Sequence, residues 1–153
     1  MKVFLESSDC MKYDLVVVGM GPSAAFLAYE LIQLNNYKNV LLIDQGKPVE
    51  KRCCPIEKAG KCLKCKPYCN ITCGFSGAGA FSDGKLNTGV KDKEGRINYI
   101  LDTFVKHGAK ENITYDSKPH VGTDILANVI VSMREEIIKL GGTILFYYKK
   151  GMI

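Results

Sequence analysis

The sequence predicts an α/β protein in which a parallel sheet is flanked by helices. The first observation is an apolar run, Leu15 to Val18, that leads into a glycine-rich turn and a helical pattern. The second is another apolar run, Val40 to Ile43, which suits a strand buried on both faces of a parallel sheet. The third is helical periodicity after residue 95, followed by a β-branched and aromatic stretch from Thr143 to Tyr148.

The turn after the first strand has the pattern of a dinucleotide-binding fingerprint. It reads Gly19-Met20-Gly21-Pro22-Ser23-Ala24, with alanine at the third glycine position. Gly19 allows a sharp turn, and Gly21 has no Cβ to keep a pyrophosphate from the backbone. Pro22 suits the first turn of a helix, whose N–H groups and positive end attract phosphate. The sequence therefore predicts a Rossmann-like FAD/NAD(P)-binding βαβ fold.

Asp44 and Gln45 follow the second predicted strand. A carboxylate at this position can accept hydrogen bonds from a ribose diol and repels a 2′-phosphate. The alternative interpretation is an ordinary βαβ unit with a tight turn and no ligand.

Three helices are predicted from the spacing of apolar residues. The first runs from Gly21 to about Leu34, the second begins at Arg96, and the third ends before Gly141. Their expected buried faces are, in order, Ala24, Leu27, Ala28 and Leu31; Ile97, Ile100, Leu101, Phe104 and Val105; and Leu126, Val129, Ile130, Met133 and Ile137.

Composition indicates a globular, cytoplasmic protein. Of 153 residues, 46% are hydrophobic and 24% are charged. No apolar run approaches the roughly 20 residues that span a bilayer, and the N-terminus has no apolar core of a signal peptide. We therefore expect no membrane partner.

The net charge of +5 is concentrated between Lys47 and Lys66. Because this segment also contains cysteines and comes after a dinucleotide motif, compensation of thiolates or phosphates is a simpler interpretation than nucleic-acid binding. We expect no nucleic-acid partner. A solvated loop without a partner is the alternative.

Residues 47–89 form a long Cys/Gly-rich loop without periodicity, and loops of this length are usually functional. Six of the seven cysteines lie between Cys53 and Cys73. Such clustering indicates an iron–sulfur cluster, zinc or redox thiols, and reduced, unliganded cysteines are the remaining alternative. The candidate metal ligands are Cys54, Cys62, Cys65 and Cys69.

The second half of this loop reads GFSGAGAFSDGK, from Gly74 to Lys85. Its glycines permit close backbone approach, and successive N–H groups can form a nest for an anion. Contact with a cofactor is therefore expected here; the alternative is a turn that only lets the loop fold over.

At these residues the sequence resembles a family of microbial FAD-dependent oxidoreductases with a glutathione-reductase-like FAD domain. The resemblance covers about Tyr13 to Phe146. It rests on VVVGMGPSAAFLAYEL, on the Cys-Pro and CxxC cluster, on SGAGAFSDGKLN and on YDSKPHVGTDIL. Ser76 departs from the family, which typically has glycine there, and Tyr68 lengthens the cysteine spacing.

The resemblance implies FAD as the cofactor and a flavin-dependent oxidoreductase as the function, with NAD(P)H as a candidate electron donor and an unknown small-molecule substrate. Pyrophosphate is expected at Gly19, Gly21, Pro22 and Ser23, and the adenosine ribose at Asp44. Ala24 and Gln45 are also expected among the cofactor-binding residues. Arg52 is expected to contact the cofactor, and Gly77, Ala78 and Gly79 to lie near the pyrophosphate or flavin.

The expected organisation is an N-terminal extension, residues 1–12, and an N-terminal portion of an FAD-binding domain, residues 13–153. Proteins of this family are several hundred residues long, with a substrate domain that is absent here. We therefore expect an incomplete domain, a fragment whose partner is the missing C-terminal part of the same enzyme. A cysteine-ligated metal or iron–sulfur module on a βαβ scaffold is the alternative function.

Overall fold

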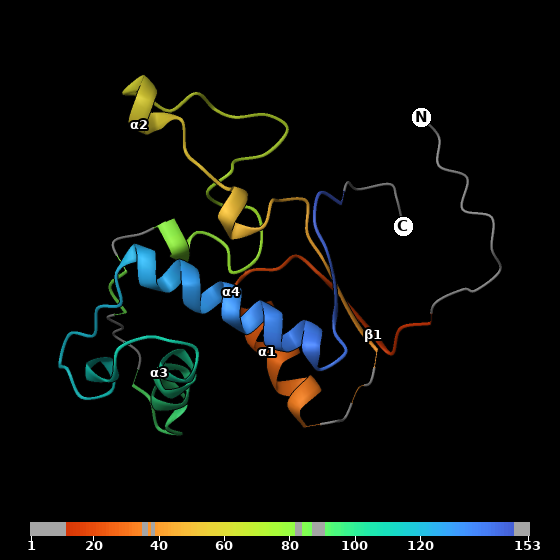
Figure 1. Ribbon diagram of the computed structural model, residues 1–153, viewed down its shortest axis with the longest axis vertical. Helices are drawn as coiled ribbons and strands as arrows, with labels where there is room; N and C mark the ends of the chain where they lie inside the picture. The colour runs from red at the N-terminus through yellow and green to blue at the C-terminus, as the bar shows by residue number, and fades with distance from the viewer. Residues whose placement is uncertain (1–11, 35–36, 38, 82–83, 87–90, 149–153) are drawn as a thin grey trace.

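The chain forms a small parallel sheet with helices against it. A computed structural model describes residues 12–34, 37, 39–81, 84–86 and 91–148 (Figure 1). The strands are β1 (Leu15–Val18), β2 (Val40–Ile43) and β3 (Thr143–Leu145), in the order β1-β2-β3. Both neighbouring pairs are parallel. The predicted α/β class with a parallel sheet is therefore confirmed, while a complete Rossmann sheet would need more strands than these.

The helices comprise three long ones and several short ones. The long helices are α1 (Pro22–Gln33), α3 (Arg96–Lys106) and α4 (Thr123–Lys139). The short ones are α2 (Ile56–Ala59) and the 3-10 turns η1 (Val49–Lys51), η2 (Gly79–Phe81) and η3 (Glu111–Thr114). None of these described helices combines the length and the apolar character that a bilayer span requires.

The core lies between the sheet and the long helices. Helices α1 and α4 lie side by side (Figure 1), and they contact β2 and β3 respectively. Val40 and Leu42 of β2 are fully buried with Ala28 of α1 and Val129 of α4. Each such large apolar side chain contributes about 1.5–3 kcal/mol by leaving water. Burial between these layers therefore holds the βαβ unit together.

The opposite face of the sheet is partly open to solvent. Val16 and Val18 of β1 are 46% and 73% exposed, and Leu145 of β3 is 39% exposed. Among the strands of the described residues, β2 alone approaches burial on both faces, as predicted, because Ile43 is also buried. The described part of the chain thus leaves an apolar sheet face largely uncovered.

The predicted buried face is confirmed for α4 and only in part for α1. Leu126, Val129, Ile130, Met133 and Ile137 are all buried, as expected. In α1, Ala28 is buried as expected, but the other buried residues are Ala25, Tyr29 and Ile32, and Leu27 is 46% exposed. Because α1 is apolar on nearly every side, two stripes fit the helical period and packing against α3 and α4 selects between them.

Two smaller predictions also need correction. In α3, Leu101 is buried as predicted, but Ile100 is 36% exposed. The last strand ends at Leu145 rather than Tyr148, because Tyr147 adopts a positive φ of 62° that breaks the extended backbone. The N-terminal extension predicted for residues 1–12 lies almost entirely outside the described residues.

A partly buried polar cluster joins α1, α3 and α4. His107 lies at the end of α3, with its Nε2 3.1 Å from the Tyr29 hydroxyl and its Nδ1 2.9 Å from Ser132 Oγ. Glu136 Oε2 is 3.3 Å from the same Nε2, and Lys106 donates to both Tyr29 and Glu136. Burial lowers the pKa of His107, and the nearby positive charge of Lys106 acts in the same direction, while Glu136 opposes it. The charged form of the imidazole is therefore disfavoured in the folded protein.

We expect stability to fall as the pH drops below about 6.5, the ordinary pKa of histidine. The folded pKa of His107 is depressed, so the unfolded chain binds more protons in this window and the stabilisation present at higher pH is lost. The slope for one proton is limited to about 1.4 kcal/mol per pH unit. Urea unfolding between pH 7.5 and 5.5 measures it. His107→Gln should flatten the dependence.

Candidate functional site

The turn between β1 and α1 has the backbone geometry that the fingerprint predicts. Gly19 has a φ of +89°, a conformation that favours glycine, and its N–H donates to the Ile43 carbonyl at 2.8 Å. Gly21 is the N-cap of α1 and Pro22 its first residue, and no side chain caps the helix. The first N–H groups of a helix have no partner within it. The positive end of α1 is therefore presented beside Gly21, Pro22 and Ser23, with Ala24 half-buried behind them.

The Asp44 carboxylate is hydrogen-bonded to this turn. One oxygen accepts the Met20 N–H at 2.8 Å, and the other accepts the Gly46 N–H at 2.6 Å. Each carboxylate oxygen can accept a further hydrogen bond. These two bonds therefore orient the Asp44 carboxylate and leave it able to accept hydrogen bonds from a ligand. Gln45 faces a different region, because its Nε2 donates to Cys73 Sγ at 3.3 Å.

The second glycine loop packs directly on the first. The Ser76 N–H donates to the Met20 carbonyl at 2.6 Å. A Cβ added at Gly77 would lie 3.4 Å from Pro22 Cδ and 3.8 Å from Gly21 Cα. Ala78 and Gly79 come next, on the exposed side of this contact, where η2 begins. The structure thus brings together two glycine loops that the sequence separates by about 55 residues.

Arg52 supports the second loop from inside. Only 5% of this residue is exposed. Its guanidinium donates to the carbonyls of Asn70 at 2.8 Å, Phe75 at 3.2 Å and Gly77 at 2.6 Å, and also to that of Ile71. It also lies 4.5 Å from the centre of the Phe81 ring.

Burial lowers the pKa of Arg52, Asp44 opposes this, and arginine remains protonated. The sequence predicted a cofactor contact for this residue. The structure instead uses its donors within the protein, and the cofactor contact stays a prediction.

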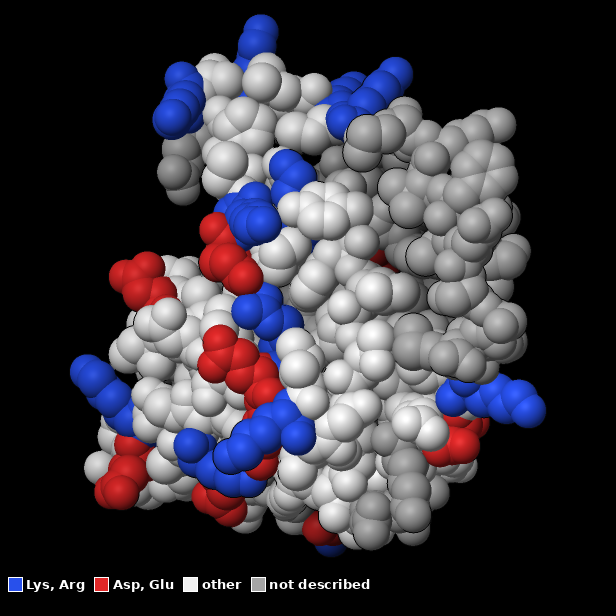
Figure 2. Space-filling model, turned by 45° about the vertical axis from the view of Figure 1, so that its right-hand side comes forward, with Lys and Arg blue, Asp and Glu red and all other residues white. Residues whose placement is uncertain are grey.

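The cysteines lie in a projecting part of the chain that we call the cysteine lobe, residues 53–73. It extends away from the sheet and helices and includes α2 (Figure 1). Lys and Arg side chains gather on this part of the surface (Figure 2). The described basic residues of the lobe are exposed: Lys58, Lys61, Lys64 and Lys66.

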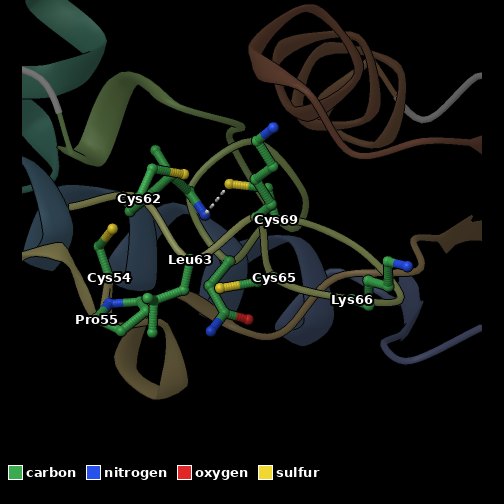
Figure 3. A pocket seen from close by; sticks show the side chains of 10 residues that line it. Cys54, Pro55, Cys62, Leu63, Cys65, Lys66 and Cys69 are labelled. Carbon is green, nitrogen blue, oxygen red and sulfur yellow. Dashed lines mark hydrogen bonds between the residues drawn. The ribbon is translucent and has the colours of Figure 1, made fainter. Parts of the chain in front are cut away.

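A cavity of about 330 Å³ in the cysteine lobe is lined by all four predicted metal ligands. Figure 3 shows Cys54, Cys62, Cys65 and Cys69 around it. The Ile71 N–H donates to Cys69 Sγ at 3.4 Å, and this bond and one from the Thr72 backbone lower the pKa of the Cys69 thiol.

Within the described ranges, however, no three His, Cys, Asp or Glu side chains come close enough together to hold a metal ion. The iron–sulfur or zinc site therefore stays a prediction.

Two features of the site had only partial signals in the sequence. Arg52 is the single arginine among six lysines between Lys47 and Lys66, and nothing in the spacing distinguishes it.

The second feature is the pairing of the end of the second glycine loop with the connector before α4. The Leu86 N–H donates to the Pro119 carbonyl at 2.9 Å, and the Val121 N–H donates to the Gly84 carbonyl at 2.9 Å. The two paired segments belong to SGAGAFSDGKLN and YDSKPHVGTDIL, two of the strings on which the family resemblance rests. That resemblance was the signal in the sequence that these segments belong to the site.

Comparison with known proteins finds a much longer relative of this chain. No protein-family model matches the chain. The chain is 44% identical over 134 residues to an uncharacterized protein of Clostridium beijerinckii. The match covers 88% of this chain but only 24% of the relative, so the chain spans about a quarter of the length of the curated relative it matches.

Proposed function

We propose that this chain is the FAD-binding portion of a flavin-dependent oxidoreductase, built on the first part of a Rossmann-like FAD domain. One observation carries the proposal: two glycine loops pack together at the N-terminus of α1, with the Asp44 carboxylate bonded to the same turn. Ligands of open parallel sheets bind at the carboxyl ends of the strands. This is the edge at which Gly19 and Asp44 follow β1 and β2.

The residues present fit the adenosine diphosphate half of FAD. A Cβ at Gly21 would meet no atom of the described residues within 4 Å, so these residues leave space open in front of the backbone there. The first N–H groups of α1 would bind the pyrophosphate, aided by the positive end of the helix. The free acceptor capacity of Asp44 would bind the ribose diol. When bound, FAD would supply the flavin ring that exchanges electrons with the substrate or with NAD(P)H.

A longer polypeptide would complete the proposed enzyme. The relative is much longer than the aligned region, since the match covers 24% of it. The exposed Val16 and Val18 side chains leave apolar surface on the sheet, and such surface commonly marks an interaction site. We propose that the remaining part of the enzyme covers this face and supplies the substrate domain.

Nucleotide selectivity tests the proposed function. The 153-residue chain is titrated with FAD, ADP, FMN and 2′-phosphorylated ADP, and binding is followed by calorimetry. Because the proposed contacts are to pyrophosphate and ribose, FAD and ADP should bind at least tenfold more tightly than FMN, which lacks the adenosine half. The 2′-phosphate should weaken binding because it faces Asp44. Equal binding of FMN and FAD, or no binding of FAD and ADP at millimolar concentration, would contradict the proposal.

Gly21→Ala should weaken ADP binding while changing the free energy of unfolding little. No atom lies within 4 Å of the new Cβ, so we expect less than about 1 kcal/mol of change in unfolding free energy, as for other changes at a helix N-cap. The methyl group would stand where the pyrophosphate approaches, and affinity for ADP should fall at least tenfold, which is about 1.4 kcal/mol. Thr123→Ala, at the start of α4, is the matched control and should leave ADP binding unchanged.

A further inference from the structure

Two of the four cysteines on the lobe cavity are exposed. Cys62 and Cys69 are open to solvent, whereas Cys54 and Cys65 are half-buried, and all four are free thiols. In Figure 3 the sulfur atoms of Cys62 and Cys69 point toward one another. A pair of accessible thiols on one cavity can form an internal disulfide after reaction with an external one.

The surroundings of Cys69 favour it as the thiol that attacks first. Cys69 is exposed on the cavity, and the Ile71 N–H donates to its sulfur at 3.4 Å, which fixes the position of the sulfur on the cavity wall. The wall that carries this amide is held by Arg52, whose guanidinium binds the Asn70 and Ile71 carbonyls. Thiolate is the nucleophile in disulfide exchange. Cys62 is then available to attack the sulfur that Cys69 has joined to the reagent.

The chemistry of the cavity favours an anionic reagent with an apolar part. Lys64 and Lys66 line it and are exposed, and no acidic residue belongs to its described lining. Pro55, Leu63 and Ile71 add apolar surface. A positively charged cleft raises the local concentration of anions and their association rate.

We propose that the cysteine lobe is a thiol–disulfide exchange centre for anionic low-molecular-weight disulfides, with Cys69 attacking and Cys62 resolving. The Cys69 sulfur attacks a disulfide R–S–S–R, so that a Cys69–S–S–R bond forms, the original S–S bond breaks, and one RS⁻ leaves. The Cys62 sulfur then attacks Cys69 Sγ and releases the second RS⁻. The two protein thiols are oxidised, the reagent is reduced to two thiols, and the two thiol protons go to the released thiolates or to water. This activity does not require bound FAD.

The first experiment uses dithiobis(nitrobenzoate), an aromatic dicarboxylate disulfide that releases a coloured thiolate. With the reduced full chain in excess, each reagent molecule should release both of its thiolates rapidly. Peptide mapping should find a Cys62–Cys69 disulfide. Cys69→Ser should remove the fast phase. Cys62→Ser should keep the first release, slow the second at least tenfold and leave the reagent attached to Cys69. Cys53→Ser, at an exposed cysteine outside the cavity lining, is the matched control and should behave as the original chain.

A second experiment tests the charge of the cavity. The double variant Lys64→Glu, Lys66→Glu should slow the reaction with the anionic reagent roughly tenfold at low salt, and the difference should vanish at about 1 M salt. Its reaction with neutral dipyridyl disulfide should change little. Three results would overturn the proposal: similar rates for all the cysteines, a mapped disulfide between other residues, or thiols that react only after zinc or iron is removed from the purified protein. The last would identify a metal site.

Discussion

An Arg52→Met variant is expected to lose roughly 3–5 kcal/mol of unfolding free energy, a large effect for one substitution. Methionine approximates the length of the side chain but donates no hydrogen bonds. The carbonyls of Asn70, Ile71, Phe75 and Gly77 would lose a charged donor in a site where only 5% of Arg52 is exposed. Chemical denaturation gives the loss, and hydrogen exchange should show faster exchange across residues 69–81.

The comparison with lysine isolates the shape of the guanidinium. Arg52→Lys keeps the charge but cannot donate in four directions from a planar group, so we expect it to recover less than half of the stability lost in Arg52→Met. Lys51→Met is the matched control, because Lys51 is the exposed neighbour, and it should change stability by less than about 0.5 kcal/mol. If Arg52→Met were as stable as Lys51→Met, the support that Arg52 gives to the second glycine loop would be disproved.

The same variant tests how the two candidate sites are connected. Arg52 binds Asn70 and Ile71, which line the cysteine cavity, and also Gly77, which lies against Pro22 at the first glycine turn. One side chain therefore supports both the wall of the cavity and the loop beside the proposed pyrophosphate site. Loss of this support should weaken ADP binding and slow the reaction of Cys69 together.

The sequence predicted the buried face of a helix well where charged residues occupied the other faces. In α4 the residues opposite the apolar stripe include Asp124, Glu135 and Lys139, so only one face could be buried, and that face was predicted correctly. In α1 almost every side is apolar, and the helical period alone could not choose between two stripes. Tertiary packing made that choice, which is information that a single helix does not contain.

In the candidate site, too, some features could be predicted from the residue pattern and others could not. The glycine turn and Asp44 were predictable because backbone conformation and hydrogen bonding impose particular residue types at particular spacings. The clustering of cysteines likewise predicted that Cys54, Cys62, Cys65 and Cys69 share a neighbourhood, and they line one cavity. The role of Arg52 was not predictable from residue patterns, because its partners are main-chain carbonyls and main-chain groups leave no residue pattern to recognise.

Contact between main-chain atoms is also the reason for a second large loss of stability, which we expect for Gly46→Ala. A Cβ at Gly46 would lie 2.2 Å from Gly74 N, 2.3 Å from the Cys73 carbonyl carbon and 2.5 Å from its oxygen. These are backbone atoms and cannot rotate away as a flexible side chain would. We expect a loss of roughly 3 kcal/mol or more, which corresponds to a melting temperature lower by roughly 6–12 °C for a chain of this size.

Gly79→Ala is the matched control for stability, because a Cβ there would meet no atom within 4 Å in the described part of the chain. It should melt within about 2 °C of the original chain. Gly46→Ala should also weaken ADP binding relative to the original chain. The Gly46 N–H binds the Asp44 carboxylate at 2.6 Å, and the Gly46 carbonyl accepts the Tyr147 N–H at 3.1 Å. A shift at Gly46 therefore moves the carboxylate that would bind ribose. Normal stability in Gly46→Ala would mean that the segments at residues 46 and 73–74 do not cross as closely as described.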